Sequence, residues 1–516
     1  MTHDYQKTLG CATIGLALAF ISPAVGQNSG VSALRPDDGG PGDLFGHSIA
    51  TKGEQLVVGA PRHDLNGNNA GAAYVYQYDG YEWGFVQKLS MTDGNGAPTA
   101  GDAVAIADGW IAVGAGGSDL QGVDSGAVYF FRYDSTLGWV ESQHFVPEDA
   151  SGYDYFSSRI AMCGDHFFGS SLLDDDLGPQ SGSVYWLSPK NDEWIFGQKI
   201  SASDGAAEDW FGMSLATDGH RLVVGAPRHD AAVSNAGAAY VFEFDPSSEQ
   251  WIETTKLVPS DAALSDDELW FGQHVAVTSD HIVVGAGWTD GARWSETAAY
   301  VYTLGTNGWE ESTKLVPSDN PVGRASVAIH GDSILVGARG FPQFEQYGAV
   351  YRFDWDGVSW TESAVLQPDD VLPEDNYGAP VVTDSGWLAT GAVAESTEKS
   401  GQVFVFDIGA SPRLTVEPHP LVSGAYGEFT ITNGNSGALT WLLFSLDGPD
   451  PTFIPALNVV VDLDQPRIAA GPRRADGEGT TTWRGAMPTV ARVTPVWFQA
   501  VQFELVTNSV STELVP

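Results

Sequence analysis

Aspartates recur at fixed positions along this sequence, and their carboxylates are its clearest candidates for chemistry. One set lies seven residues before an apolar segment in five successive stretches of the chain: Asp64, Asp119, Asp175, Asp230 and Asp290. Carboxylates gathered on one face would bind calcium or a basic ligand, because a cation relieves the repulsion between like charges. Aspartate also accepts backbone N–H bonds in tight turns. We expect ligand binding by this set, with the turn role as its alternative.

A second set of aspartates follows a recurring segment that separates these stretches. Its members are Asp38, Asp93, Asp149, Asp204, Asp261, Asp319 and Asp370, and turn chemistry is the favoured explanation for them. Two loops carry candidate metal ligands, one with Asp64, Asn66 and Asn68 and the other with Asp174 and Asp176. Calcium is the cofactor that such oxygen ligands would hold.

An internal repeat supplies the elements that must position these residues. A glycine in an apolar-Gly-small pattern recurs seven times, at Gly59, Gly114, Gly169, Gly225, Gly285, Gly337 and Gly391. Each copy contains four short segments with the alternating pattern of strands; in the fourth copy they are 211–216, 221–225, 238–244 and 251–258. Four strands repeated seven times predict an all-β fold, a seven-bladed β-propeller.

The seventh copy lacks an outer strand, and the other end of the chain supplies a matching segment. In six copies the outer strand begins with a tryptophan, which we expect to pack at the blade edge: Trp83, Trp139, Trp194, Trp251, Trp309 and Trp360. Residues 32–38 match the end of the fourth outer strand and the connection after it, 255–261. The N-terminal segment, about 31–38, is therefore predicted to close the last blade and remove its open edge.

The repeated motifs resemble a known family. Phe45-Gly46, Phe211-Gly212 and Phe271-Gly272 are each followed about 13 residues later by Gly-Ala, with a proline next at Pro61 and Pro227. This pattern is similar to FG-GAP repeats, a family that includes the integrin α-subunit propeller and bacterial secreted proteins. The resemblance implies the propeller fold and a binding or adhesion role. The family's calcium loops are not implied, because the connections between strands one and two are tight turns here, such as 52–54 and 330–332.

Both ends of the chain fall outside the repeat. Residues 1–26 have the pattern of a signal peptide, with Lys7, an apolar run and small residues before Gln27, which predicts a secreted, cell-surface or periplasmic protein. Residues 27–410 form the predicted propeller. From 411 to 516 alternating stretches predict a small β-sandwich-like C-terminal module.

Composition and motifs limit the classes of function that the chain could have. The formal net charge of −42 disfavours nucleic acid and anionic lipid surfaces, and no segment beyond the signal peptide predicts a membrane span. A His-Asp pair ends both Val57–Asp64 and its unchanged copy Val223–Asp230, which repeat duplication explains without catalysis. We expect a non-catalytic protein that binds an extracellular protein or polysaccharide through an acidic loop face. The alternatives are a glycan-active enzyme with carboxylates in the central channel and a purely structural envelope component.

Overall fold

The structure of the whole chain is a computed structural model. It describes residues 31–408 except 65–68, 92–97, 232, 263–268, 288–295, 307, 322, 340–347, 369–370, 373–374 and 394–398, together with the strands between 413 and 515. The expected signal peptide, 1–26, lies outside the described residues, as do Asn66, Asn68, Asp93, Asp290 and Asp370. None of the helices among the described residues is long and apolar enough to span a membrane.

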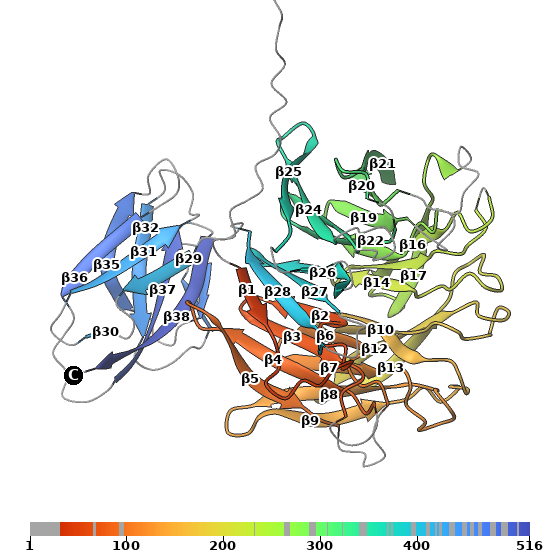
Figure 1. Cartoon of the computed structure of the whole chain (residues 1–516), viewed down its shortest axis with the longest axis horizontal. Helices are drawn as coiled ribbons and strands as arrows, with labels where there is room; N and C mark the ends of the chain where they lie inside the picture. Colours follow the sequence, from red (N-terminus) through yellow and green to blue (C-terminus); the bar gives the residue numbers. More distant parts are fainter. Residues whose placement is uncertain are drawn as a thin grey trace, which may run out of the picture.

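Seven four-stranded antiparallel sheets form a seven-bladed β-propeller, as predicted (Figure 1). The first three blades comprise β2 (Ser48–Lys52), β3 (Gln55–Ala60), β4 (Ala72–Tyr78) and β5 (Trp83–Leu89); β6 (Ala103–Ala107), β7 (Trp110–Ala115), β8 (Ala127–Asp134) and β9 (Gly138–Phe145); and β10 (Phe156–Cys163), β11 (His166–Ser171), β12 (Ser183–Lys190) and β13 (Glu193–Ile200). In each of them the strands are hydrogen-bonded in sequence order.

The next three blades repeat this order. They comprise β14 (Ser214–Thr217), β15 (Arg221–Ala226), β16 (Ala238–Asp245) and β17 (Gln250–Leu257); β18 (His274–Val277), β19 (His281–Ala286), β20 (Ala298–Gly305) and β21 (Gly308–Leu315); and β22 (Ala325–His330), β23 (Ser333–Ala338), β24 (Ala349–Trp355) and β25 (Trp360–Leu366). The connection between strands one and two is a tight turn, of two residues in the first blade, between Lys52 and Gln55.

The last blade takes strands from both ends of the repeat region. It comprises β26 (Tyr377–Asp384), β27 (Trp387–Ala392) and β28 (Gln402–Asp407), with β1 (Val31–Leu34) as its outer strand. β1 pairs antiparallel with β28, so that Val31 faces Phe406 and Leu34 faces Val403. Figure 1 shows β1, in red, beside β28, in light blue. The chain thus closes the ring with the segment that the sequence analysis assigned to this place.

The glycines of the repeated motif stand where neighbouring blades touch. A Cβ on Gly59 would lie 2.1 Å from the carbonyl oxygen of Gly101 in the next blade. Gly46 has a φ of +92°, and a Cβ there would lie 2.9 Å from the carbonyl oxygen of Gln402 in the seventh blade. Only glycine allows this backbone approach. The periodic glycines therefore set the spacing between blades.

Apolar side chains fill the space between adjacent blades. One core cluster, for example, combines Val57 and Val75 of the first blade with Val104, Ile111 and Tyr129 of the second. Several of the predicted edge tryptophans are buried, with Trp194 at 1% and Trp251 at 2% exposure. These residues belong to the packing that holds each blade to the next.

The C-terminal residues also form strands. These are β29 (Arg413–Glu417), β30 (Leu421–Val422), β31 (Tyr426–Thr432), β32 (Leu439–Ser445), β33 (Pro451–Ile454), β34 (Val459–Asp462), β35 (Arg467–Arg474), β36 (Thr481–Ala486), β37 (Thr494–Gln502) and β38 (Leu505–Val515). They pair in sheets of three, five and two strands.

Candidate functional site: the loop face of the propeller

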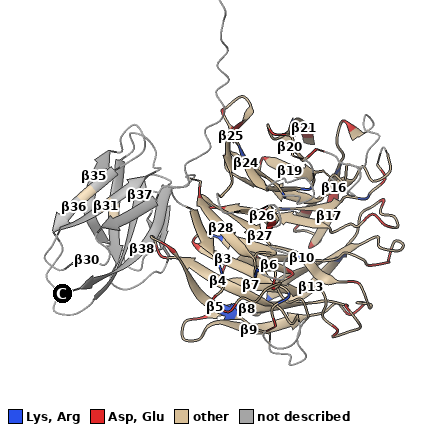
Figure 2. Ribbon diagram, in the orientation of Figure 1, with Lys and Arg blue, Asp and Glu red and all other residues tan. Residues whose placement is uncertain are grey.

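One face of the propeller gathers most of the predicted site residues. In the first blade Ser48 pairs with Gly59, and Gly59 with Ala73, so β2 begins where β3 ends and β4 begins. The loops between second and third strands and the connections between blades therefore lie on the same face, which we call the loop face. Figure 2 shows Asp and Glu recurring in the loops, whereas Lys and Arg are few.

Four aspartates of the first set are described, and all four are exposed. Each carboxylate accepts the backbone N–H five residues further along its own loop, at 2.7–2.9 Å: Asp64 from Asn69, Asp119 from Asp124, Asp175 from Gln180 and Asp230 from Asn235. One oxygen, Oδ1, thus fixes each loop. The other, Oδ2, has no hydrogen-bond donor among the described residues.

The candidate metal ligands do not gather into a metal site in the described part of the chain. Asp174 is buried and lies 2.8 Å from the Lys199 ammonium, and Asp176 lies 2.5 Å from the same group. The lysine occupies the space between these two carboxylates. No group of three or more His, Cys, Asp or Glu residues suited to a metal ion occurs among the described residues.

Four described members of the second aspartate set lie in turns and also form clasps with the blade that follows each turn. Asp204 lies in the connection before the fourth blade, where its Oδ1 accepts a hydrogen bond from the Tyr240 hydroxyl at 2.9 Å and its Oδ2 one from Lys256 at 2.7 Å. Lys256 faces Tyr240 across the pair β16–β17. The same Asp–Tyr–Lys clasp recurs with Asp38, Tyr74 and Lys88; Asp149, Tyr185 and Lys199; and Asp261, Tyr300 and Lys314.

The clasps shift the pKa values of their members. Burial raises the pKa of Asp204, but the hydrogen bonds from Lys256 and Tyr240 outweigh it and leave the pKa below its usual value. Burial and the bond to Asp204 raise the pKa of the Tyr240 hydroxyl far above its ordinary value. These carboxylates are therefore charged and engaged at neutral pH. In the sixth blade Asp319 and Tyr351 lie 3.2 Å apart. Val365 faces this tyrosine where the lysine stands in the complete clasps, so the third member is missing.

The histidine of each duplicated His-Asp pair contacts the lysine of one clasp. His229 lies 2.9 Å from the carboxylate of Asp209 through Nδ1 and 2.6 Å from the Lys256 ammonium through Nε2. A neutral ring with its proton on Nδ1 fits both contacts, since it donates to Asp209 and accepts from Lys256. His63 likewise lies 2.5 Å from Lys88. The histidines thus serve a buried structural network, and the aspartate that follows each of them belongs to a separate loop turn.

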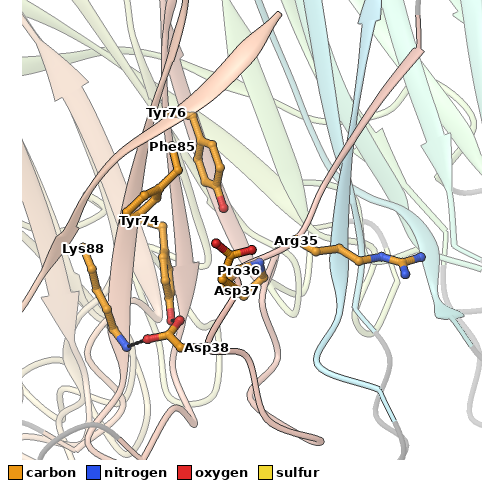
Figure 3. A pocket seen from close by; sticks show the side chains of 8 residues that line it. All are labelled: Arg35, Pro36, Asp37, Asp38, Tyr74, Tyr76, Phe85 and Lys88. Atoms are coloured by element: carbon orange, nitrogen blue, oxygen red, sulfur yellow. Dashed lines mark hydrogen bonds and ion pairs between the residues drawn. The ribbon is translucent and has the colours of Figure 1, made fainter.

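A pocket of about 190 Å³ lies where the closing strand meets the first blade (Figure 3). Tyr74, Tyr76 and Phe85 form its aromatic part, and Asp37 and Asp38 come from the connection after β1. The Tyr76 hydroxyl is buried without a hydrogen-bond partner among the described residues. In Figure 3 it points toward the Asp37 side chain.

The fifth blade has a different arrangement at the same position. There Tyr302, at the position of Tyr76, donates to the Val258 carbonyl at 2.8 Å and lies 3.3 Å from Glu311. Glu311 also accepts two hydrogen bonds from Ser260. In the first blade Phe85 faces Tyr76 as Glu311 faces Tyr302. The first blade thus lacks the second acceptor that Glu311 gives Tyr302, and the Tyr76 hydroxyl has no partner among the described residues.

The central channel has a volume of about 360 Å³ and is lined by the seven innermost strands. Its lining is mainly aliphatic, with Ile49, Val104, Ile160 and Leu215 among the residues on the loop-face side. No Asp or Glu belongs to this lining in the described part of the chain. His274 is the ionisable residue there.

Comparison with known proteins agrees with the motifs. The FG-GAP repeat matches five segments, residues 29–76, 83–131, 139–187, 194–242 and 251–302. None of the curated proteins compared with the chain matches it. Solved structures with similar folds include the N-terminal domain of Nup159, with 11% identity, a TM-score of 0.39, and coverage of 73% of this chain and 94% of that one.

Two further solved structures are similar at the same distant level. Sqt1 from Chaetomium thermophilum has 12% identity and a TM-score of 0.43, with 75% of this chain and 92% of that chain covered. The β-propeller domain of the Trilobed protease from Pyrococcus furiosus has 10% identity and a TM-score of 0.38, with coverage of 70% and 94%. Together with the seven blades, the five matched repeats establish that the chain belongs to the FG-GAP repeat proteins.

Proposed function

We propose that the protein is a secreted, non-catalytic binding protein that holds a positively charged group of its ligand on the loop face. The observation that carries this proposal is the state of the four described loop aspartates. Each of these exposed residues uses Oδ1 to fix its loop, and its Oδ2 has no hydrogen-bond donor among the described residues. Loops fixed in this way lose little entropy on binding, and their free oxygens suit ammonium or guanidinium groups, or calcium.

The partner in this proposal is an extracellular protein or polysaccharide, as expected for adhesion. The signal peptide at 1–26 would export the chain to the cell surface, the periplasm or the medium. A β-sandwich-like module at 411–516 would act as a spacer or attachment. The alternative of a glycan-active enzyme needs a carboxylate pair in the channel, and the described lining offers none. The five matched repeats are compatible with the second alternative, a structural envelope component.

The test separates the loop role of the aspartates from their charge. Asn keeps an acceptor oxygen for the N–H five residues ahead, so D64N/D119N/D175N should fold while it loses three charges from the loop face. The matched control is D134N/D245N/D356N, because these aspartates cap the hairpins between third and fourth strands on the opposite face.

An oligolysine peptide and calcium chloride serve as probes. We expect the loop-face variant to weaken oligolysine or calcium binding at least tenfold more than the control does, in an interaction that added salt weakens. Equal binding by the two variants would show that overall charge, and not the loop face, attracts cations.

A further inference from the structure

Basic residues lie at the loop-face end of the channel, although the chain as a whole is strongly acidic. Acidic residues outnumber basic ones by 66 to 24. Nevertheless, Arg159 directly precedes the lining residue Ile160, His274 lines the channel itself, and Arg324 stands two residues before the lining residue Ser326. These three residues come from the third, fifth and sixth blades. We call the opening that they surround the channel mouth.

The channel mouth has few counter-charges. Neither Arg159, Arg324 nor His274 forms an ion pair with a carboxylate among the described residues. Asp102 is the carboxylate whose charge acts on Arg159. It is already engaged by the Thr99 hydroxyl, which donates to its Oδ2 at 2.6 Å.

The three residues stand at the same end of strands that line one channel, and their charges influence one another. Burial together with the charges of Arg159 and Arg324 lowers the pKa of His274 to about 4. Burial and the charges of Arg339 and Arg159 lower the pKa of Arg324. His274 is therefore neutral at pH 7, and the charges of the arginines repel each other. Such repulsion costs stability unless an anion joins them.

Aromatic and polar groups complete the mouth. The Arg324 guanidinium lies over the Trp270 ring, 5.9 Å from its centroid, which helps to hold the group in place. Trp270 in turn meets Trp210 edge to face at 5.7 Å. Arg159 donates to the Ser158 backbone carbonyl at 2.6 Å, and the Ser158 hydroxyl is buried with no hydrogen-bond partner among the described residues. A hydroxyl and two guanidinium groups are the donors that recognise an oxyanion.

We propose that the channel mouth binds an oxyanion, a sulfate, phosphate or carboxylate group of a ligand, through Arg159 and Arg324. Both side chains supply planar sets of N–H donors that match oxyanion geometry. The neutral His274 ring, which lines the channel, provides a further hydrogen-bonding group. The site is separate from the acidic loops and goes beyond the cation binding proposed for them. A ligand with both charges would engage the two together.

Titration calorimetry with inorganic sulfate at pH 7 tests this proposal, with sodium chloride at equal ionic strength as the reference. Phosphate and acetate titrations in the same buffer show whether a tetrahedral or a planar oxyanion is preferred. We expect saturable binding that R159Q and R324Q each weaken by about tenfold or more, as loss of a charged hydrogen bond implies. R324K, which keeps the charge, should restore part of the affinity.

Arg132→Gln is the matched control, because Arg132 is a half-exposed arginine paired with Asp192 away from the channel. It should bind sulfate like the wild type. Equal affinity in R159Q, R324Q and R132Q, or no saturable binding by the wild type, would overturn the proposal. D64N/D119N/D175N should bind sulfate at least as well as the wild type, so failure here is distinguishable from failure of the proposed cation binding.

Discussion

The Asp204 carboxylate and the Tyr240 hydroxyl are joined by a hydrogen bond of 2.9 Å across 36 residues of sequence. Asp204 belongs to the connection that leaves the third blade, and Tyr240 to the third strand of the fourth. The bond thus fastens an exposed connection to the blade that follows it. Lys256 completes the clasp from the neighbouring outer strand.

Removal of this clasp should destabilise the propeller. We expect Asp204→Ala to lower the free energy of unfolding by about 1–2 kcal/mol, because the buried Tyr240 hydroxyl loses its acceptor. Asp204→Asn should cost less, since its amide oxygen can still accept. Urea unfolding measures both, with the exposed loop residue Asp230→Asn as control. A wild-type free energy in Asp204→Ala would show that water replaces the carboxylate without loss.

Substitutions in the pocket beside the closing strand should be able to stabilise the protein. A single F85E change places a carboxylate near Asp37, and we expect no benefit from it. D37S/F85E recreates the pair that Ser260 and Glu311 form in the fifth blade, and it gives the Tyr76 hydroxyl an acceptor. The double variant should gain about 0.5–1.5 kcal/mol over the wild type, the net contribution of a hydrogen bond. Equal stability of single and double variants in thermal unfolding would contradict this explanation of the pocket.

Closure of the ring should depend on Leu34. Its side chain is 6% exposed and packs in a cluster with Val58 and Val403, between the first and seventh blades. Leu34→Ala should lower the free energy of unfolding by about 2–5 kcal/mol, the range for a buried leucine. Ala33→Ser, at an exposed position of the same strand, is the control and should change little. Similar urea midpoints for the two variants would mean that β1 adds little to closure.

The repeat explains why so much of the fold could be predicted. Gly59 and its counterparts meet the backbone of the next blade, so their spacing records the blade period directly. The closing segment was predictable because residues 32–38 match a connection such as 255–261. The clasps had a signal that the sequence analysis missed: a tyrosine recurs in the third strand, and a lysine often recurs opposite it, as at Tyr74 and Lys88.

The channel mouth could not have been found in the same way. Arg159, His274 and Arg324 occupy different positions within their repeats, so no periodicity links them. The ring brings the first strands of distant blades around one axis, and this places the three residues at one end of the channel. The pocket at Tyr76 is equally a product of closure, since its walls come from β1 and from the first blade. Repeat logic predicts what blades share, whereas these sites arise where blades differ.

His274 should make stability depend on pH in a defined window. Its pKa in the folded protein, lowered to about 4 by burial and by Arg159 and Arg324, lies below the ordinary value of 6.5. Between these two values the unfolded chain binds the proton and the folded protein does not, so stability falls as pH falls from about 6.5 to about 4. His274→Gln removes the imidazole that binds this proton. The variant should therefore lose less stability than the wild type between pH 7 and pH 5, as measured by urea unfolding. Sulfate at a saturating concentration should reduce the loss in the wild type, because a bound anion favours protonated His274. Parallel pH profiles of the two proteins would show that His274 does not titrate under the influence of the arginines at the channel mouth.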